Sequence, residues 1–539
     1  MGVTSGEEFD YVIVGGGSAG AILAARLSEK PEVSVCLIEA GPRDKNPFIH
    51  IPAGFIKVIF DPGLTWGYET EPGPHIDNRK LPVIQGKLLG GSGSINGMVW
   101  VRGQRDDFDD WAAAGNEGWS YDDILPYYRK LERRIGEGEA EFRGRAGGIP
   151  VMDLSWKNKL VDAFMAGAQE IGIPYNADYN GRDQAGVGRY QYNIDRGKRY
   201  SAAKAYLKPA AGRRNLEVRT DALATRIVFE GRKAVGLEYR KTGDSTTRTV
   251  RARREVILCG GAVNSPKLLM LSGVGPSTVL NDAGVPVVHE LAGLGQNYMD
   301  HYTPRLTYRA KNAVSINGLA SGPRLLGQML RWGLGMPSIL GMGVVLGAAF
   351  WKTRPELNRP NIVVTFTPGT FKQGFLGRLD DFPGMTTGVW QLRPDSRGWM
   401  KIVSSDPMAK PSIQPNFLAE ESDRRTAVEA LRIARKIMAT PQMAALTETE
   451  TMPGIETDSD EELLAYTRSQ GLCGYHASGT ARMGRADDPM AVVDSGLRVH
   501  GMDGLRIVDA SVMPIVVSGN TNAATMMIAE KTADMIRAG

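Results

Sequence analysis

The stretch Tyr11-Val12-Ile13-Val14-Gly15-Gly16-Gly17-Ser18-Ala19-Gly20 decides the fold class of this chain. Its four apolar residues predict a short buried strand, and three glycines with the spacing GxGxxG follow directly. The small and apolar residues Ala21 to Leu27 then predict a helix. A strand, a tight glycine turn and a helix in this order are typical of the opening unit of a dinucleotide-binding α/β fold.

The three glycines of this turn are expected to serve different purposes. Gly15 permits the tight turn, Gly17 lets the backbone approach a pyrophosphate, and Gly20 lets the helix pack closely on the strand. The helix N-terminus at Ser18 and Ala19 offers unpaired N–H groups and the positive end of its dipole to phosphates. A GxGxxG turn on its own would also suit any glycine-rich α/β protein.

A second predicted strand supplies the context that the glycine turn needs. Val33 to Ile38 is apolar and ends at Glu39, nineteen residues after Gly20. An acid at the tip of this strand can accept hydrogen bonds from ribose hydroxyls. We therefore predict that Glu39 and the adjoining Ala40 belong to a dinucleotide site, although the pattern suits NAD and FAD equally.

Two further glycine-rich segments lie far along the chain, from Gly86 to Gly97 and from Gly261 to Gly275. The first could hold many backbone N–H groups against an oxygen-rich ligand, or could be a flexible surface loop. The second follows an apolar strand, Glu255 to Cys259. Another predicted strand, Leu505 to Ala510, is tipped with a polar residue. One nucleotide-binding fold is thus expected to draw on both ends and the middle of the chain.

Composition excludes several other classes of protein. The chain has 539 residues with 64 basic and 60 acidic side chains, which is too even a balance for a protein built to bind nucleic acid. Cys36, Cys259 and Cys473 are far apart, so neither a disulfide framework nor a metal site is expected. The polar start from Met1 to Asp10 lacks a secretory pattern, and together with the thiols it predicts a cytoplasmic protein.

The glycine-rich segments resemble the signatures of the glucose–methanol–choline (GMC) family of FAD-dependent oxidoreductases. Gly86 to Asp109 matches the first signature, including Asn96, Trp100 and Gly103, and Gly261 to Gly275 matches the second. The resemblance covers essentially the full chain. It implies an α/β fold (α+β overall), in which a Rossmann-like FAD-binding domain is interleaved with a substrate domain built on an antiparallel sheet with helices.

The resemblance also implies how the two domains share the chain. The FAD-binding domain would take residues 1–155, 205–305 and 470–539, and the substrate-binding domain residues 156–204 and 306–469. Periodic segments inside the second range agree with this division, because Asn361 to Phe366 and Gly388 to Leu392 read as strands and Arg424 to Met438 reads as a helix.

The catalytic candidates come from chemistry and from the resemblance together. Alcohol oxidation needs a group that accepts the hydroxyl proton, and imidazole is suited to this because its pKa is near neutrality. Of six histidines, His476 lies in a segment, His476 to Thr480, that matches the catalytic block of the family. The resemblance implies that His476 is the base and that Asn520 is its hydrogen-bonding partner, as in the His/Asn branch of choline oxidases, choline dehydrogenases and hydroxymethylfurfural oxidases.

The resemblance further implies a set of FAD contacts. Because Ile95 stands where some members carry a histidine that bonds the flavin, the FAD is expected to be non-covalent. The residues implied are Gly15, Gly17, Ser18, Ala19, Gly20, Glu39, Ala40, Gly91, Asn96, Gly97, Met98, Val99, Ala224, Asp509, Ala510, Asn520 and Thr521.

The expected activity is oxidation of a primary alcohol to the aldehyde, with an aryl, furan or other small alcohol as substrate. His476 would take the hydroxyl proton, hydride would pass to flavin N5, and O2 or another acceptor would reoxidise the flavin. The alternatives are a choline-dehydrogenase-like or aliphatic alcohol dehydrogenase, a hydroxynitrile lyase or a fatty-acid photodecarboxylase on the same fold, and a dinucleotide-binding protein without catalysis. The oligomeric state is not predicted.

One segment stands apart from these motifs. Trp332 to Trp351 runs twenty residues without a charge, which is long enough to span a bilayer. Five glycines and Pro337 make it a poor continuous helix, so we expect a buried loop and helix beside a substrate pocket. Peripheral membrane contact is the alternative.

Overall fold

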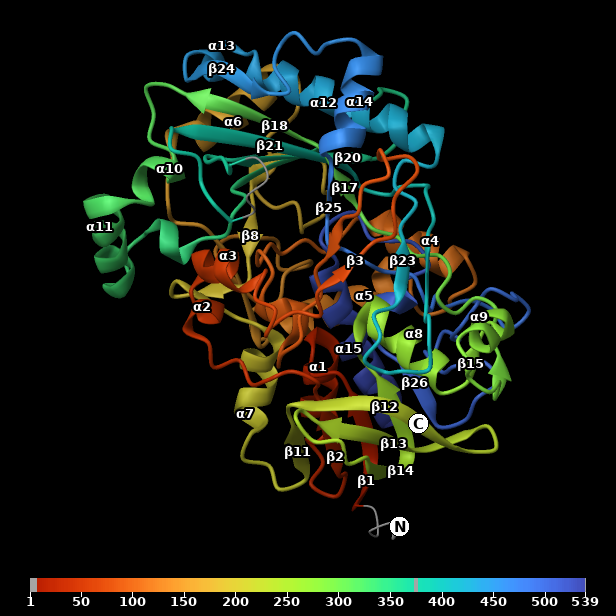
Figure 1. Cartoon of the computed structure of the whole chain (residues 1–539). Helices are drawn as coiled ribbons and strands as arrows, with labels where there is room; N and C mark the ends of the chain where they lie inside the picture. Colours follow the sequence, from red (N-terminus) through yellow and green to blue (C-terminus); the bar gives the residue numbers. More distant parts are fainter. Residues whose placement is uncertain (1–6, 373–376, 539) are drawn as a thin grey trace.

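The computed structural model describes residues 7–372 and 377–538 of the chain. The prediction drawn from Met1 to Asp10 therefore falls mostly outside the described residues. Two large sheets dominate the architecture, and they lie at opposite ends of the molecule (Figure 1).

The first sheet has seven strands and contains the predicted nucleotide-binding unit. Strands β11 (Leu216–Arg219), β2 (Val35–Ile38), β1 (Glu7–Val14) and β14 (Arg248–Leu258) lie side by side in parallel. The C-terminal half of β14 also pairs in parallel with β26 (Leu505–Ile507). Its N-terminal half pairs antiparallel with β13 (Lys233–Lys241), which pairs with β12 (Ala222–Glu230).

Three helices cover this sheet and confirm the strand–turn–helix prediction. Helix α1 (Ser18–Leu27) follows β1 directly, and α8 (Gly261–Leu271) follows β14. Helix α15 (Thr521–Ala538) packs against α1, which brings the C-terminal part of the chain beside the first glycine turn (Figure 1). Strand β1 begins four residues before the predicted Tyr11. Its last four residues are buried, as expected of an apolar run inside a covered sheet.

The second sheet is antiparallel and lies at the top of Figure 1 under α12 (Glu421–Met438). Its order is β24 (Thr447–Met452), β18 (Arg305–Ala310), β21 (Gly384–Gln391), β20 (Ile362–Thr367), β19 (Gly347–Trp351) and β7 (Gly186–Arg189). The predicted strands near residues 361–366 and 388–392 and the helix near 424–438 are thus present, with shifted ends. Apolar side chains of β20 and α12 form a separate core with α6 (Lys159–Glu170).

The remaining helices and strands are shorter or connect the two ends. They are α2 (Pro47–His50), α3 (Phe55–Val58), β3 (Tyr68–Glu69), β4 (Pro82–Val83), α4 (Arg105–Ala113), α5 (Tyr121–Leu131), β5 (Glu132–Ile135), β6 (Ile149–Asp153), β8 (Gln191–Tyr192), β9 (Ile194–Asp195), β10 (Lys198–Arg199), α7 (Lys208–Ala210), β15 (Val274–Gly275), α9 (Ser277–Asp282), β16 (His289–Glu290), β17 (Tyr302–Thr303), α10 (Ile316–Leu319), α11 (Gly322–Gly333), β22 (Trp399–Lys401), β23 (Ser412–Gln414), α13 (Pro441–Ala444), α14 (Asp460–Gln470) and β25 (Leu472–Cys473), with the short turns η1 (Pro52–Gly54), η2 (Gly91–Ser94), η3 (Ala203–Leu207), η4 (Ile339–Gly341) and η5 (Ala510–Val512).

We propose the two-domain division given above, and sheet membership supports it. All strands of the seven-stranded sheet come from residues 7–258 and 505–507, outside the ranges 156–204 and 306–469. The antiparallel sheet takes its strands from 186–189 and 305–452. A third sheet, β5-β6-β8, joins residues 132–153 to 191–192 and so crosses the proposed boundary at residue 155.

The expectation for Trp332 to Trp351 is wrong in its first half. Residues 333–337 are exposed, and α11, which ends there, buries none of its side chains. The second half enters β19, whose residues Gly347 to Phe350 are buried. The uncharged run is therefore divided among the end of α11, the turn η4 and β19, which lie in different surroundings. No helix within residues 7–372 and 377–538 is long and apolar enough to cross a membrane.

Candidate active site

A cavity of ≈ 310 Å³ opens at the carboxyl ends of the parallel strands. Val14 and Gly15 at the end of β1, Ile38 and Glu39 at the end of β2, and Leu258 at the end of β14 all line it. Open α/β sheets bind ligands at this edge because the strand ends and the following helix N-termini converge there. The cavity extends to Tyr475, His476 and Asn520 on the far side.

The structure brings nearly all of the sequence-predicted residues together around this cavity. Those in its lining are Gly15, Gly17, Ser18, Ala19, Glu39, Ala40, Gly91, Asn96, Gly97, Met98, Val99, Ala224, His476, Asp509, Ala510, Asn520 and Thr521. Gly20 is the exception, because it is not among the residues that line the cavity.

The three glycines of the first turn differ as the sequence predicts. Gly15 has φ +100°, and a Cβ there would lie 2.5 Å from the carbonyl oxygen of Cys259. A Cβ on Gly20 would lie 1.9 Å from the carbonyl oxygen of Gly15, so this residue lets α1 pack on the turn. A Cβ on Gly17 would find its nearest protein atom at 3.8 Å, an ordinary contact. The protein itself therefore leaves Gly17 open toward the cavity.

Glu39 is buried and holds the loops on both sides of it. Its carboxylate accepts hydrogen bonds from the backbone N–H of Gly16 at 2.7 Å and of Gly41 at 2.8 Å. Burial raises the pKa of Glu39 to about 7, against the opposing effect of these two hydrogen bonds. Each carboxylate oxygen keeps a second lone pair, so ribose hydroxyls can still donate to it.

Asn96 is fixed by an arginine that sequence reasoning missed. The Arg199 guanidinium donates to Asn96 Oδ1 and to the Asn96 carbonyl oxygen, both at 2.7 Å, and to the Ile49 carbonyl oxygen at 2.8 Å. No carboxylate pairs with Arg199 among the described residues, and burial lowers its pKa to about 9. The residue has no motif around it, so only the three-dimensional structure identifies it.

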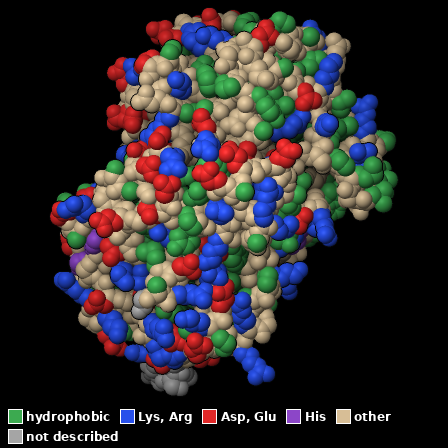
Figure 2. All heavy atoms as spheres, turned by 180° about the vertical axis from the view of Figure 1, so that it is seen from behind, with side chains coloured by type: hydrophobic (Ala, Val, Ile, Leu, Met, Phe, Trp, Pro, Cys, Tyr) green, Lys and Arg blue, Asp and Glu red, His purple; other side chains and the backbone are tan. Residues whose placement is uncertain are grey.

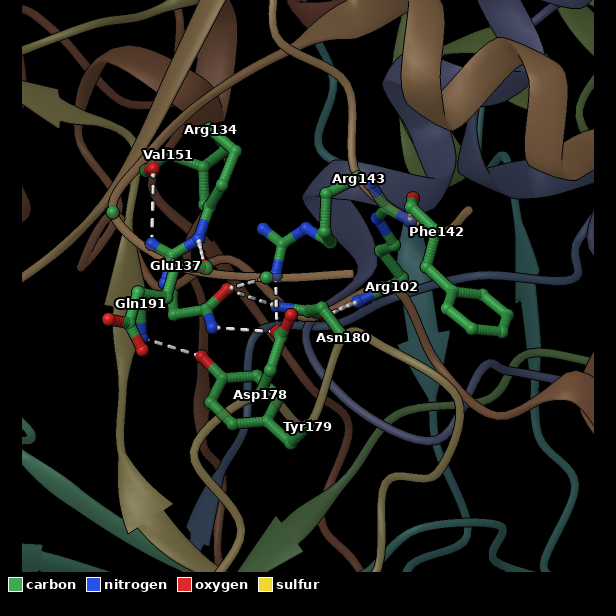
Figure 3. Close-up of polar contacts among 12 residues, drawn as sticks. Arg102, Arg134, Glu137, Phe142, Arg143, Val151, Asp178, Tyr179, Asn180 and Gln191 are labelled. Atoms are coloured by element: carbon green, nitrogen blue, oxygen red, sulfur yellow. Dashed lines mark hydrogen bonds and ion pairs between the residues drawn. The ribbon is translucent and has the colours of Figure 1, made fainter. Parts of the chain in front are cut away.

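The loop from Met98 to Arg102 is anchored from behind by a buried polar cluster (Figure 3). Arg102 donates to Glu132 at 2.6 Å and to the Phe142 carbonyl oxygen at 2.6 Å. Arg143 donates to the same Glu132 carboxylate at 2.7 Å. The carbonyl oxygen of Trp100 accepts from Tyr179 and Asn180. Both arginines and Glu132 are almost completely buried, so this cluster fixes the backbone that presents Met98 and Val99 to the cavity.

His476 and Asn520 form the predicted pair. Asn520 Nδ2 lies 2.8 Å from His476 Nε2. An amide nitrogen can only donate, so His476 Nε2 accepts this hydrogen bond and carries no proton. Asn520 Oδ1 is buried without a partner among the described residues, and it is a free acceptor at the cavity wall.

A second histidine, His301, settles the protonation of the first. His301 Nε2 lies 2.9 Å from the carbonyl oxygen of Leu392, which can only accept, so Nε2 carries the proton. His301 Nδ1 is then an acceptor, and it lies 2.8 Å from His476 Nδ1. His476 Nδ1 must therefore carry a proton, which leaves Nε2 unprotonated, as the acceptor of the Asn520 hydrogen bond. Four groups in a row thus agree on one placement of protons, with the lone pair of His476 at the cavity.

The surroundings keep both imidazoles neutral. Burial, and then the neighbouring His301, lowers the pKa of His476 well below 6.5. Burial lowers the pKa of His301 to about 4.

Behind the two histidines, Asp300 accepts hydrogen bonds from the backbone N–H of His476 at 2.7 Å and from Cys473 Sγ at 3.0 Å. Burial raises the pKa of the Cys473 thiol, which keeps this cysteine protonated and unreactive.

Asn520 is positioned by the turn before it. Asp107 accepts from the backbone N–H of Ser518 at 2.6 Å and from its hydroxyl at 2.7 Å. Gly519 has φ +153°, and a Cβ there would lie 2.3 Å from Val101 Cγ1. Helix α15 begins at Thr521, so Asn520 is held between an anchored turn and a helix N-terminus.

Comparison with known proteins identifies the family. Residues 9–303 match the N-terminal family model described as GMC oxidoreductase, and residues 394–529 match the C-terminal model of the same description. The chain belongs to the GMC oxidoreductase family. GMC oxidoreductases are FAD-dependent, and this chain is therefore an FAD-dependent oxidoreductase acting on the CH–OH group of an alcohol.

Relatives of this GMC oxidoreductase cover nearly its whole length. It is 40% identical over 531 residues to an alcohol dehydrogenase [acceptor] of Pseudomonas putida, covering 98% of this chain and 95% of that protein. It is also 40% identical over 538 residues to an oxygen-dependent choline dehydrogenase of Serratia proteamaculans, covering 98% and 96%. Among solved structures, pyridoxine 4-oxidase from Mesorbium loti has a TM-score of 0.89 at 31% identity, covering 98% of this chain and 99% of that one. A formate oxidase from Aspergillus oryzae has a TM-score of 0.93 at 28% identity, covering 99% of each chain.

The cavity of this GMC oxidoreductase fits FAD on its own evidence. Two glycine-rich loops meet at its wall, since a Cβ on Gly91 would lie 2.8 Å from the Cα of Gly17. Asn522 Nδ2, like Asn520 Oδ1, is buried without a partner among the described residues, and both residues line the cavity. Orphaned polar atoms beside backbone N–H groups suit a ligand with phosphates and many hydrogen-bonding atoms.

Proposed function

We propose that this enzyme oxidises a neutral primary alcohol to the aldehyde, with His476 as the base and Asn520 as its partner. The observation that carries the proposal is the hydrogen-bonded row from Leu392 through His301 and His476 to Asn520, which leaves His476 Nε2 unprotonated at the cavity. A substrate hydroxyl that enters between the two side chains would donate to Nε2 and accept from Asn520 Nδ2.

The residues of this chain then perform the proton transfer. His476 Nε2 accepts the hydroxyl proton, and Asn520 Nδ2 stabilises the negative charge that develops on the oxygen. His301 Nδ1 accepts from His476 Nδ1–H and so holds the ring as it becomes charged. When bound, FAD supplies the acceptor for the hydrogen and two electrons that leave the alcohol carbon. With Ile95 buried at the lining of the cavity, we propose that FAD is held without a covalent bond.

The charges around the cavity favour a neutral alcohol over choline. Glu39 and Asp509 are the only carboxylates among the described residues that line it. Glu39 is engaged by Gly16 and Gly41, and Asp509 by the Gly261 N–H, Ser265 and Ser511. The lining includes Val99 and, next to His476 in the sequence, Tyr475, so a quaternary ammonium group would find an aromatic ring but no free carboxylate there. The name of the Pseudomonas putida relative agrees with an alcohol as the substrate class.

The test is an anaerobic screen for bleaching of the bound flavin. Aryl, furan, aliphatic, choline-like and sugar alcohols are mixed with the holoenzyme, and oxygen is then admitted. Bleaching by an aryl or aliphatic primary alcohol supports the proposal, and the rate after admission of oxygen separates O2 from another acceptor. Bleaching by choline alone would reject the neutral-alcohol assignment, and no bleaching by any alcohol would favour a lyase or a photodecarboxylase.

The His476 assignment has its own measurement. His476→Ala is expected to slow flavin reduction by ~10²–10⁴-fold, the usual contribution of a positioned general base, while FAD stays bound. Stopped-flow reduction by the best alcohol, with the flavin content measured beforehand, checks both parts. An unchanged rate of reduction would exclude His476 as the base.

The cellular location belongs to this proposal as well. Cys36, Cys259 and Cys473 are all buried and unpaired. We propose a cytoplasmic enzyme, since free thiols suit a reducing compartment.

A further inference from the structure

Helix α11 exposes an apolar stripe that nothing in the described structure covers. Leu326, Met329, Leu330 and Leu334 recur at the spacing of one helix face, and their side chains are 61%, 51%, 69% and 77% exposed. Met336 beyond the helix is also exposed, at 46%. Apolar side chains gathered on one outer face are a feature of surfaces that bind something.

The opposite face of α11 attaches the helix to the body. Trp332 Nε1 donates to the Gly197 carbonyl oxygen at 2.8 Å, and the Gln328 carbonyl oxygen accepts from Ser338 Oγ at 2.8 Å. These contacts fix the rotation of the helix, so the stripe points outward. Figure 1 shows α11 projecting from the left of the molecule, and Figure 2 shows from behind that hydrophobic side chains gather on this projection.

The charges around the stripe are positive. Arg324 and Arg331 lie on the helix, and Arg196 lines the small hollow at its base together with Trp332 and Met336. The sequence from Lys311 to Pro355 contains no Asp or Glu. Asp195 beside the hollow is paired with Arg133 at 3.0 Å. The stripe is therefore flanked by cations, and no free acidic group lies near the stripe in the sequence.

We propose that the exposed stripe of α11 docks on an anionic lipid bilayer. A helix of 12 residues is about 18 Å long, too short to span the ~30 Å hydrocarbon core, and suits a position in the plane of the interface. Leucine and methionine side chains enter the acyl boundary while arginines meet anionic headgroups.

A second copy of the chain is the less suitable occupant. Stable protein interfaces take about 20–30 residues from each side, and this stripe offers far fewer. A two-fold arrangement would also bring Arg324 and Arg331 near their own copies. Lipid headgroups have the opposite charge, and a bilayer needs no complementary shape.

The experiment is sedimentation of the full-length holoenzyme with lipid vesicles. Vesicles of phosphatidylcholine with phosphatidylglycerol are compared with vesicles of phosphatidylcholine alone, each at low and high salt. The wild type is expected to bind the anionic vesicles, and more weakly at high salt because surface charges are screened. The double variant L330E/L334E is expected to lose more than about 10²-fold in binding, since each buried leucine contributes roughly tenfold or more. R324Q/R331Q should lose roughly 5-fold for each arginine.

The control is Ile455→Glu, which places one glutamate at another exposed apolar side chain, 73% exposed and far along the chain from α11. It should bind vesicles like the wild type, and all variants should keep their flavin and their activity on a soluble alcohol. Failure of the wild type to bind anionic vesicles overturns the proposal, as does equal loss in I455E. A dimer in sedimentation equilibrium that L330E/L334E dissociates would assign the stripe to a second copy instead.

Discussion

His476 receives its chemical character from the side chains and backbone around it. A free imidazole has a pKa near 6.5. At that pH half of the imidazole molecules are protonated and cannot act as a base. In this protein burial and His301 lower the pKa of His476 well below that value. The ring is therefore neutral at neutral pH, and the hydrogen-bonded row decides which nitrogen carries the proton.

The lowered pKa predicts how the rate depends on pH. Because the shift is downward, the base is fully available at and above pH 6.5 and is lost only as the pH falls through the lowered value. We expect kcat/KM with a non-ionisable alcohol to be level above pH 6.5 and to decline on the acid side. A pH–rate profile measures this, and an acid limb centred above 6.5 would contradict it.

His301 is a positioning residue in this scheme, and two substitutions separate its role from packing. His301→Leu removes the acceptor for His476 Nδ1–H, so flavin reduction should lose part of the ~10²–10⁴ that a positioned base supplies. His301→Asn keeps an acceptor oxygen near the position of Nδ1 and should recover much of the rate. Stopped-flow reduction and the pH profile of both variants provide the readout. Equal rates in the two variants would reduce His301 to a packing residue.

At the scale of elements, the first glycine turn allows a matched comparison. Gly20→Ala forces its Cβ against the Gly15 carbonyl oxygen, and the displacement of α1 should cost about 1–3 kcal/mol of unfolding free energy or more. In Gly17→Ala the new Cβ has no protein atom closer than 3.8 Å, and the φ of −74° suits alanine. The apoprotein should therefore keep its stability. This variant should instead bind FAD more weakly, because the Cβ enters the space at the cavity.

Thermal unfolding of both apoproteins and titration with FAD distinguish these effects. Comparable losses of stability in the two variants would show that Gly17 serves the fold as Gly20 does. Unaltered FAD affinity in Gly17→Ala would show that the ligand does not approach this residue.

The polar cluster behind the Met98 to Arg102 loop gives a prediction about stability. Glu132→Gln leaves Arg102 and Arg143 buried without the carboxylate that they share, and breaking such a buried pair usually costs about 3–5 kcal/mol. Denaturant unfolding measures the loss. Asp487→Asn is the control, because its partner Arg485 and Asp487 itself are both exposed, and its unfolding free energy should hardly change. A small effect of Glu132→Gln would mean that water or rearrangement compensates the two arginines.

At the scale of the whole molecule, the sequence predicts those features of the fold that depend on residues close together in the chain. The strand–turn–helix unit is correct because two of its requirements are local: Gly15 has a positive φ in the turn, and a Cβ on Gly20 would meet the Gly15 carbonyl oxygen. The family signatures extend this to the cavity lining, where Gly20 is the one predicted residue that lies elsewhere. The two sheets appear with their expected character, although β1 is longer than predicted.

What the sequence does not reveal depends on contacts between distant segments. His301 lies 175 residues from His476, and nothing near it in the chain indicates that the two rings meet. Arg199 is likewise recognisable only once Asn96 is beside it. The uncharged run predicts burial for Leu334 and Met336, which are exposed, because apolar composition alone does not tell which side of a segment faces the protein.

The interleaving of segments has a consequence for synthesis of the enzyme. Ser18 Oγ donates to Asn522 Oδ1 across 504 residues, and the strand β26 joins the sheet beside β14 from residue 505 onward. A growing chain can fold β1, β2 and β14 on the ribosome long before Asn520 exists, because domains form as their segments emerge. The nucleotide site therefore stays open on one side, and His476 lacks its partner, until the segment from β26 to the start of α15 has been translated. Catalysis begins only when that segment docks.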